Sequence, residues 1–382
     1  MKPQSDPARL LVVIVVGLVL LSTAVVSVRS VGANQATDVK PAEVQTKSLR
    51  GALLAVEQVT DQRLDELKRD GTTAIVLLLS GGDQRAAEDA ASERIRAAGL
   101  ELHYWLEVAH CPELADAHPD WMASLQGHPE WRRLFSDPPT PGEDEVVKTY
   151  PWVPILSKES FDGQLQRMKR LLANRPQSTG VFLNDLQGAP SACGCGNHLC
   201  RWTTDYGKRR TTTPLKNDAP SKFVAEVRKL LPQSEVIPVW TTECEEHDGA
   251  ADGLCAGVGC FKGICWKAWT EQLVPVARDS SQIGVLLPYK AFQRDLPIYR
   301  KPAGWITEAM KSFQTMPARY KQPPAPSSRL IAVLQGWDVT DQQIAQQISV
   351  ASEAGAVGQI VAYTELDQSW SPKLVPLELQ QH

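Results

Sequence analysis

The sequence predicts an α/β fold, a closed (β/α)8 barrel of the TIM type with long loops after its third, fourth and fifth strands. Most of its extended apolar runs are separated by stretches with helical periodicity, which is typical of parallel strands joined by crossover helices. Acidic, aromatic and cysteine residues collect just after the downstream ends of the runs, where the loops of such a barrel carry the chemistry. Eight runs recur along residues 51–364, at Gly51–Glu57, Thr73–Ser80, Leu100–Ala109, Thr179–Leu186, Glu235–Thr241, Ile283–Tyr289, Arg329–Trp337 and Gly358–Thr364.

The individual runs differ in ways that fit a parallel sheet. Thr73–Ser80 is continuously apolar, as strands that are buried on both faces are. Leu100–Ala109 alternates, which leaves Trp105 and Glu107 on one face. Asp61 and Gly99 are expected to begin and end helices. The predicted helices are Gln62–Arg69, Gln84–Ala98, Phe161–Ala173, Ala219–Leu231, Trp266–Ala277, Trp305–Phe313 and Thr340–Ala354.

The connections after the third, fourth and fifth strands are unusually long. Residues 110–157 exceed an ordinary connection in a compact barrel, and residues 242–265 are acidic and rich in cysteine. A full eighth helix is not expected, because Pro372 and Pro376 interrupt the tail. We expect the tail to pack as a short turn over the outside of the barrel.

The N-terminus predicts a membrane segment. Leu10–Val28 carries no charge and is rich in Val and Leu, and as a helix it would span about 28 Å, close to the thickness of a bilayer core. We expect residues 1–9 to form a short cytoplasmic tail, 10–28 a single-pass signal-anchor, 29–50 a linker and 51–382 one extracytoplasmic barrel domain. A cleaved signal peptide is the alternative, and it would also export the barrel.

The composition and charge of the chain limit the kinds of molecule that it is expected to bind. The 382-residue chain has a formal net charge of −4 and no basic stripe, so nucleic acid is not an expected partner. Eleven tryptophans fall mostly in or beside the predicted loops. The sequence does not indicate an oligomeric state.

The predicted strand ends bring carboxylates and aromatic rings to one rim. A pair of carboxyl groups can cleave a glycosidic bond, one protonating the leaving oxygen and the other attacking the anomeric carbon or activating water. Asp185 and Glu243 are the favoured pair, although Glu245 and Glu246 compete with Glu243 in the same loop. Aromatic rings provide apolar platforms for sugars. The predicted substrate-binding residues are Glu107, Trp105, Trp240, Tyr289, Lys290, Gln335, Trp337 and Asp338.

Structural roles are the alternatives for several of these predicted site residues. Asp185 could hydrogen-bond loop amides, Glu107 could pair with Lys290, and Asp338 could cap the helix predicted at Thr340. The tryptophans could be core residues rather than sugar platforms.

Three sequence features carry a resemblance to a family. They are the barrel pattern with a His-Pro-Asp/Glu-Trp stretch after the third strand, the Phe-Leu-Asn-Asp end of the fourth strand, and Cys-Gly-Cys-Gly-Asn-x-x-Cys-Arg-Trp from Cys193. Over residues 51–364 the chain resembles bacterial glycoside-hydrolase-like barrels and exported proteins related to them. The acids also resemble those of α-amylase-type barrels, which implies Asp185 as nucleophile and Glu243 as general acid. The chain departs from that pattern at Asn184 and Leu183, where an acid and an arginine would be expected.

The cysteines lie in three successive loops that adjacent parallel strands would place side by side. Outside the cytoplasm they are expected to pair, which restricts the freedom of the unfolded loops. A structural zinc site is the alternative, and an iron–sulfur cluster is a less favoured one. The Cys-x-Cys and Cys-x4-Cys spacings are compatible with zinc, although Cys-x2-Cys is more usual. The residues concerned are Cys111, Cys193, Cys195, Cys200, Cys244, Cys255, Cys260 and Cys265.

Together these features predict a membrane-tethered, exported glycoside hydrolase-like protein with a carbohydrate substrate or ligand and no catalytic cofactor. Two alternatives stay open. The barrel could bind carbohydrate as a scaffold without cleaving it, or it could be a metal-dependent hydrolase that uses the cysteine loops.

Overall fold

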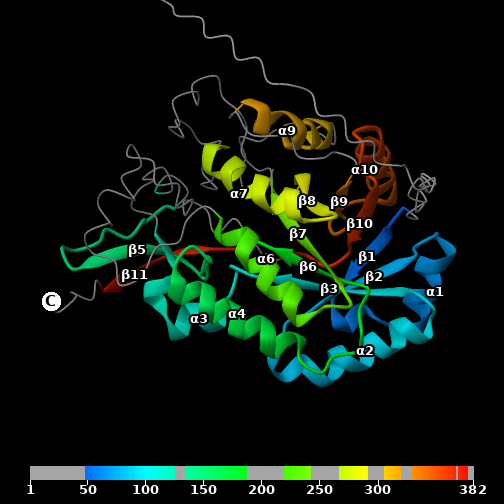
Figure 1. Ribbon diagram of the computed structural model, residues 1–382, viewed down its shortest axis with the longest axis horizontal. Coiled ribbons are helices and arrows are strands. Elements are labelled where there is room, and N and C mark those ends of the chain that lie inside the picture. Colours follow the sequence, from blue (N-terminus) through cyan, green and yellow to red (C-terminus); the bar gives the residue numbers. More distant parts are fainter. Residues whose placement is uncertain are drawn as a thin grey trace, which may run out of the picture. The chain divides into compact units, whose positions relative to one another are not determined.

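The structure is a computed structural model of the chain (Figure 1). It describes residues 48–124, 132, 135–186, 218–241, 266–290, 305–319, 329–366 and 369–376. The predicted tail, anchor and most of the linker therefore lie outside the described residues, as do most of the loops after the fourth and fifth barrel strands.

Eight parallel strands close into a barrel, which confirms the predicted fold class. Each predicted apolar run overlaps one strand, with bounds that differ by a few residues at most. Around the barrel the order is β1, β10, β9, β8, β7, β6, β3 and β2. The strands are β1 (Arg50–Leu54), β2 (Ala74–Leu78), β3 (Glu101–Glu107), β6 (Gly180–Asn184), β7 (Glu235–Thr241), β8 (Ile283–Leu287), β9 (Leu330–Gln335) and β10 (Gly358–Ala362).

The register shows which side chains fill the barrel. Trp105 of β3 is paired with Phe182 of β6, and Glu107 is paired with Asn184. Residues in register point to the same face of a sheet, and Tyr104, on the opposite face, donates to Ser92 of the outer layer at 3.3 Å. Trp105, Phe182, Glu107 and Asn184 therefore point into the barrel.

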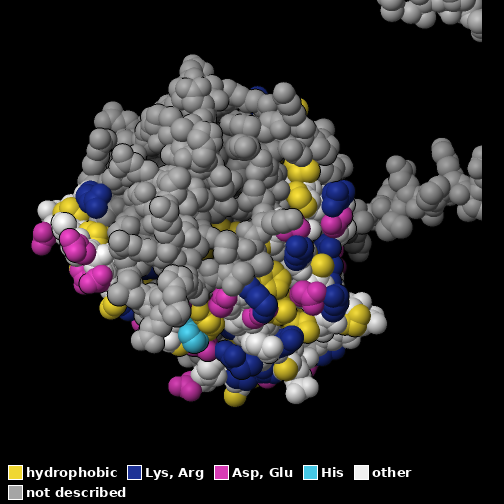
Figure 2. All heavy atoms as spheres, turned by 60° about the vertical axis from the view of Figure 1, so that its left-hand side comes forward, with side chains coloured by type: hydrophobic (Ala, Val, Ile, Leu, Met, Phe, Trp, Pro, Cys, Tyr) yellow, Lys and Arg dark blue, Asp and Glu magenta, His cyan; other side chains and the backbone are white. Residues whose placement is uncertain are grey.

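Helices form the outer layer (Figure 1). Ser157, Thr60 and Thr340 are N-caps whose hydroxyls accept backbone N–H groups, so Thr60 rather than Asp61 caps the first helix. Charged side chains of both signs are interspersed on the described part of the surface in Figure 2, without a basic stripe. The described outer helices are α1 (Asp61–Arg69), α2 (Arg85–Ala97), α4 (Lys158–Leu172), α6 (Ala219–Leu230), α7 (Trp266–Asp279), α9 (Trp305–Arg319) and α10 (Asp341–Glu353).

The tail corrects one expectation. It forms β11 (Ser371–Pro376), which pairs antiparallel with β5 (Glu145–Tyr150), and β5 pairs with the short β4 (Ala123–Ser124). Because β11 is an edge strand of this second sheet, its prolines need not donate to a ladder on both sides. The prolines therefore exclude a helix in this segment but not a strand.

The second sheet belongs to the rim where β3 ends. His110 forms an isolated bridge with Trp152, and the ring Nε2 of His110 lies 3.1 Å from the carbonyl oxygen of Ser369. Trp152 is buried with Ala109 and Ala123, and Trp370 packs against this cluster. The long connection after β3 and the tail after β10 thus meet in one substructure, together with α3 (Pro112–Ala117) and the 3-10 turn Pro119–Trp121.

Within the described residues, no helix has the length and apolar character needed to cross a bilayer. The segment predicted to do so, Leu10–Val28, was not among them.

Candidate active site at the carboxyl ends of the barrel strands

The Glu107 carboxylate is the best-defined polar group of the barrel mouth. The Trp105 indole Nε1 donates to Glu107 Oε1 at 2.7 Å, and Asn184 Nδ2 donates to Glu107 Oε2 at 2.8 Å. Trp105 and Asn184 are 0% and 1% exposed, whereas Glu107 is only partly buried. Each carboxylate oxygen is therefore held by a buried neutral donor, and Glu107 is the member of the three that reaches solvent.

The backbone around Glu107 is fixed as well. Arg167 of α4 donates from Nη1 to the carbonyl oxygen of Glu107 at 2.7 Å, and Val108 N–H donates to the carbonyl of Asn184 at 3.1 Å. Gln164, one turn earlier in α4, donates to the Val153 carbonyl at 2.9 Å. One face of α4 thus holds both the end of β3 and the return of its long loop.

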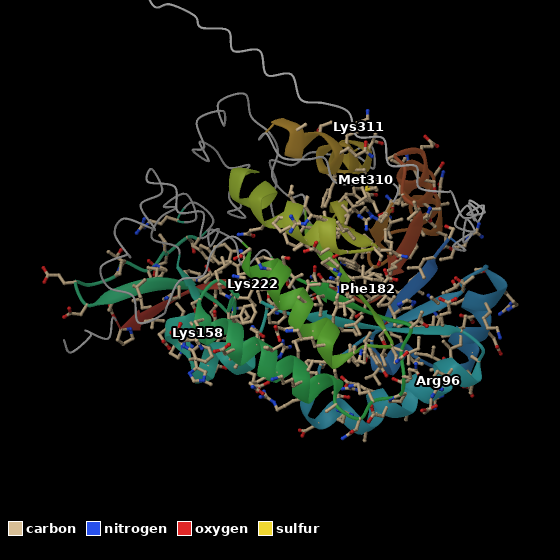
Figure 3. The ribbon with its side chains drawn as sticks, viewed as in Figure 1. Arg96, Lys158, Phe182, Lys222, Met310 and Lys311 are labelled. Atoms are coloured by element: carbon tan, nitrogen blue, oxygen red, sulfur yellow. The ribbon has the colours of Figure 1, made fainter. Side chains whose placement is uncertain are left out.

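Phe182 packs against Trp105 on the inward face of the barrel. Its ring stacks on Trp105 with centroids 5.9 Å apart and an interplanar angle of 22°. Figure 3 places Phe182 among the strands, whereas Lys158 and Lys222 lie on helices of the outer layer. The stacking removes rotational freedom from the indole that holds Glu107.

Asp185 directly follows the Asn184 that holds Glu107. It is 6% exposed, and its backbone has φ of 61°. Left-handed backbone is uncommon for residues other than glycine, although aspartate tolerates it, and such residues are enriched at functional sites. The sequence prediction that Asp185 lies at a strand end is confirmed, but its catalytic role stays a prediction. Glu243, the predicted partner, lies outside the described residues with Glu245 and Glu246.

A second polar group occupies the ends of β8 and β9. The Lys290 N–H donates to Gln335 Oε1 at 3.0 Å, and Gln335 Nε2 donates to the Trp337 carbonyl at 3.0 Å. Lys290 Nζ donates to the Asp338 carbonyl at 3.0 Å and to Gln343 of α10 at 3.2 Å. Lys290 is therefore bound to α10 and does not pair with Glu107, the alternative that the sequence left open.

Asp338 and Tyr289 take specific structural positions in this second group. Asp338 has φ of 54°, and Thr340, not Asp338, is the N-cap of α10. Tyr289 is 7% exposed, and burial raises the pKa of its phenol. Substrate contact by either residue stays a prediction.

The predicted aromatic platforms are buried rings. Trp105 and Trp240 are 0% exposed and Trp337 is 8% exposed. Ile237 is in register with the inward-pointing Phe182, so Trp240, three residues later, faces the outer helices. Trp240 is therefore not part of the mouth, which corrects its predicted place there. A one-residue difference in register decides the face, and the sequence alone left it open.

Cys111 also departs from expectation. It is a free cysteine, 1% exposed, in an apolar cluster with Leu114, Met122 and Val146. Burial raises the pKa of its thiol, which disfavours the thiolate needed for metal binding. The other seven cysteines lie outside the described residues, where their pairing stays a prediction. No group of three or more His, Cys, Asp or Glu within the described part of the chain could hold a metal ion.

Sequence reasoning missed two residues of this site. Asn184 was visible only as a departure from an acidic pattern, and its role depends on its register with Glu107. Arg167 lies within a predicted helix and carries no motif, so no sequence signal could have assigned it.

Known proteins that resemble the chain do so only at low sequence identity. No protein-family model matches the chain, and no curated protein matches it. Three solved structures can be named. The endo-1,4-β-D-mannanase of Thermotoga petrophila has 10% identity and a TM-score of 0.43, with 83% of this chain and 88% of that chain covered. The β-galactosidase of Halorubrum lacusprofundi has 11% identity and a TM-score of 0.45, with 82% and 52% covered.

An HpcH/HpaI aldolase of Desulfitobacterium hafniense has 10% identity and a TM-score of 0.35, with 83% of this chain and 87% of that chain covered. These neighbours catalyse different reactions, and at such similarity they carry no argument about activity. The closed parallel barrel establishes the fold by its own topology, and the chain is similar to glycoside hydrolases and aldolases in that architecture alone.

Proposed function

We propose that the chain is a glycoside hydrolase-like protein that cleaves a glycosidic bond at the carboxyl ends of its barrel strands. The observation that carries the proposal is the placement of two acidic residues, Glu107 and Asp185, at the adjoining ends of β3 and β6. The strand ends of (β/α)8 barrels are where such enzymes carry their catalytic groups. Glycosidic cleavage needs carboxyl groups on both sides of the scissile bond.

Asp185 and Glu243 are the proposed catalytic pair. Asp185 would attack the anomeric carbon or activate water, and Glu243 would protonate the leaving oxygen. Glu107, at the end of the strand next to that of Asp185, would bind substrate. Gln335, Lys290 and Asp338 would contact the sugar from the ends of β8 and β9.

A release assay on a panel of polysaccharides tests this proposal. We expect Asp185→Asn and Glu243→Gln each to lower the rate of sugar release by about 100-fold or more, because each removes a group that takes part in proton transfer or attack. Asp65→Asn makes the same chemical change on the exposed face of α1 and should leave the rate unchanged. Full release by both site variants would reject the pair.

A non-catalytic carbohydrate-binding barrel is the second candidate. Asn184 favours it, because an amide stands where the resemblance to α-amylase-type barrels would place an acid. In that case the full chain would retain glycans on an affinity resin without releasing sugar. A metal-dependent hydrolase is the third, and metal analysis of purified, unreduced protein would detect its ion.

Membrane tethering and export complete the proposal, and they rest on the sequence of Leu10–Val28. We expect the chain to stay with membranes after alkaline carbonate extraction. Leu18→Arg, which places a charge near the centre of the segment at a cost of about 3 kcal/mol, should release it. Recovery of a shorter, soluble protein from the unmodified gene would instead indicate a cleaved signal peptide.

A further inference from the structure

Glu107, Trp105 and Asn184 form a group that is here called the Glu107 clamp. Its carboxylate is a hydrogen-bond acceptor whose orientation is fixed before a ligand binds. Of the carboxylate's lone pairs, one on Oε1 faces Trp105 and one on Oε2 faces Asn184. A carboxylate offers about four acceptor sites, so about two remain for a ligand beyond the two donors found in the described part of the chain. Because both donors are buried, the carboxylate holds its orientation before any ligand arrives.

The charge of the clamp is not neutralised by its donors. Both are neutral, and among the described residues no Lys, Arg or His side chain forms an ion pair with Glu107. Arg167 bonds the Glu107 backbone carbonyl rather than its carboxylate. Lys290, the strand-end lysine of the second group, is bound to Asp338 and α10 instead.

We propose that the Glu107 clamp binds the hydroxyl groups of a neutral glycan, and that Asn184 is the residue that positions Glu107 for this contact. A hydroxyl that donates to an ionised acceptor gains a charge-assisted bond, roughly twice as strong as a neutral one. A uronate, phosphate or sulfate on the sugar would meet like charge from Glu107. The inference rests on the proposed function, since it names the substrate class of that site.

The test measures binding of defined tetrasaccharides to the full chain in detergent, by titration calorimetry and saturation-transfer NMR. The neutral probes are cellotetraose, mannotetraose, xylotetraose and maltotetraose, and the acidic probe is tetragalacturonate. We expect at least one neutral probe to bind and the acidic probe to bind more weakly. Glu107→Gln should weaken binding of the neutral probe about tenfold, because a neutral acceptor replaces a charged one.

Asn184→Asp and the double variant Glu107→Gln/Asn184→Asp separate positioning from structural support. The single change sets two carboxylates against each other and should lower both the melting temperature and the affinity. The double change restores a hydrogen bond of reversed polarity, since the amide introduced at position 107 can donate to the carboxylate introduced at position 184. We expect the double variant to recover the melting temperature of the unmodified chain and to bind the neutral probe about tenfold more weakly than that chain does. Asn174→Asp, at an exposed left-handed position at the end of α4, is the matched control and should change neither.

Several results would overturn the inference. Wild-type affinity in the double variant would show that the charge is not used, and tighter binding of tetragalacturonate would contradict the neutral class. Calcium binding that Glu107→Gln abolishes would make the clamp a cation site. Unchanged glycan binding in Glu107→Gln, with sugar release lost in Asp185→Asn, would reject the inference and leave the proposed function standing. If the unmodified chain binds and cleaves no glycan, both fail.

Discussion

His103 is a buried histidine inside the barrel, one layer below the Glu107 clamp. Its ring tilts against Phe182 with centroids 5.6 Å apart, and a Cβ added to Gly180 would lie 2.8 Å from its Nδ1. Glu101, the first residue of β3, has its carboxylate 3.8 Å from Nε2 of His103. The Glu101 side chain is 54% exposed, so its attraction for a charged imidazole is screened. Burial lowers the pKa of His103 to about 4.

This shift predicts a loss of stability in mild acid. Below pH 6.5 the unfolded chain takes up a proton at His103 that the folded chain accepts only near pH 4, so unfolding becomes easier as the pH falls through that window. Above pH 6.5 the full contribution of His103 to stability is present. The contribution amounts to about 3 kcal/mol in total. Urea unfolding between about pH 7.5 and pH 4 measures it.

His103→Leu is the control, because it keeps the packing volume and removes the proton. Its free energy of unfolding should change less between pH 6.5 and 4 than that of the unmodified chain, by about 3 kcal/mol. Parallel pH profiles of the two proteins would contradict a buried neutral histidine. Carboxylates that titrate in the same range cancel in the difference.

At the residue scale, the sequence could predict positions but not partners. Glu107 and Asp185 were placed at strand ends because an apolar run ends beside each of them. That Asn184 holds Glu107 depends on a one-to-one register between β3 and β6, which no local pattern encodes. Trp240 shows the same limit, since its face follows from the pairing of β7 with β6.

Among the elements, α4 contains a glycine that a helix would not ordinarily favour. A Cβ added to Gly163 would lie 2.5 Å from Cζ3 of Trp121, which packs over the helix from the long loop after β3. Trp121 also stacks with His118, with centroids 3.7 Å apart at an angle of 10°. The glycine thus permits a ring to lie directly on the helix backbone.

We predict that Gly163→Ala destabilises the protein by about 1–3 kcal/mol, because the indole must move. Helix propensity alone predicts the opposite, a gain of about 1 kcal/mol. In a Trp121→Ala background the clash is absent, so Gly163→Ala should then stabilise. A double-mutant cycle by urea unfolding gives both values. Stabilisation by Gly163→Ala in the unmodified chain would show that Trp121 does not occupy this position.

The second sheet marks the limit of prediction at the element scale. The barrel strands were recognisable because burial on both faces makes them continuous apolar runs. The strands β5 and β11 mix polar and apolar residues and are far apart in the sequence, and β11 contains two prolines. Their pairing is a property of the folded rim rather than of either segment. The Pro rule excluded a helix correctly but could not indicate an edge strand.

On the scale of the whole molecule, the second sheet joins the end of the chain to the loop after β3. Val375 of β11 is 4% exposed and belongs to the cluster of Cys111, Leu114 and Val146, whereas the adjacent Leu374 is 36% exposed. The same loop is bound to the barrel through α4, where Arg167 and Gln164 bond both of its ends. The tail is therefore connected mechanically to the barrel mouth, and we expect both sheets to unfold together.

A pair of substitutions tests this cooperativity. Val375→Ala removes buried methyl groups and should lower the free energy of unfolding by about 1–3 kcal/mol. Leu374→Ala, one residue away on the solvent side, should change it by less than about 0.5 kcal/mol. If the molecule unfolds as one unit, far-UV circular dichroism and tryptophan fluorescence will report the same shifted midpoint for Val375→Ala. A shift in fluorescence alone would mean that the rim opens while the barrel stays folded, and the mouth would then be built on a support that loosens independently of the strands beneath it.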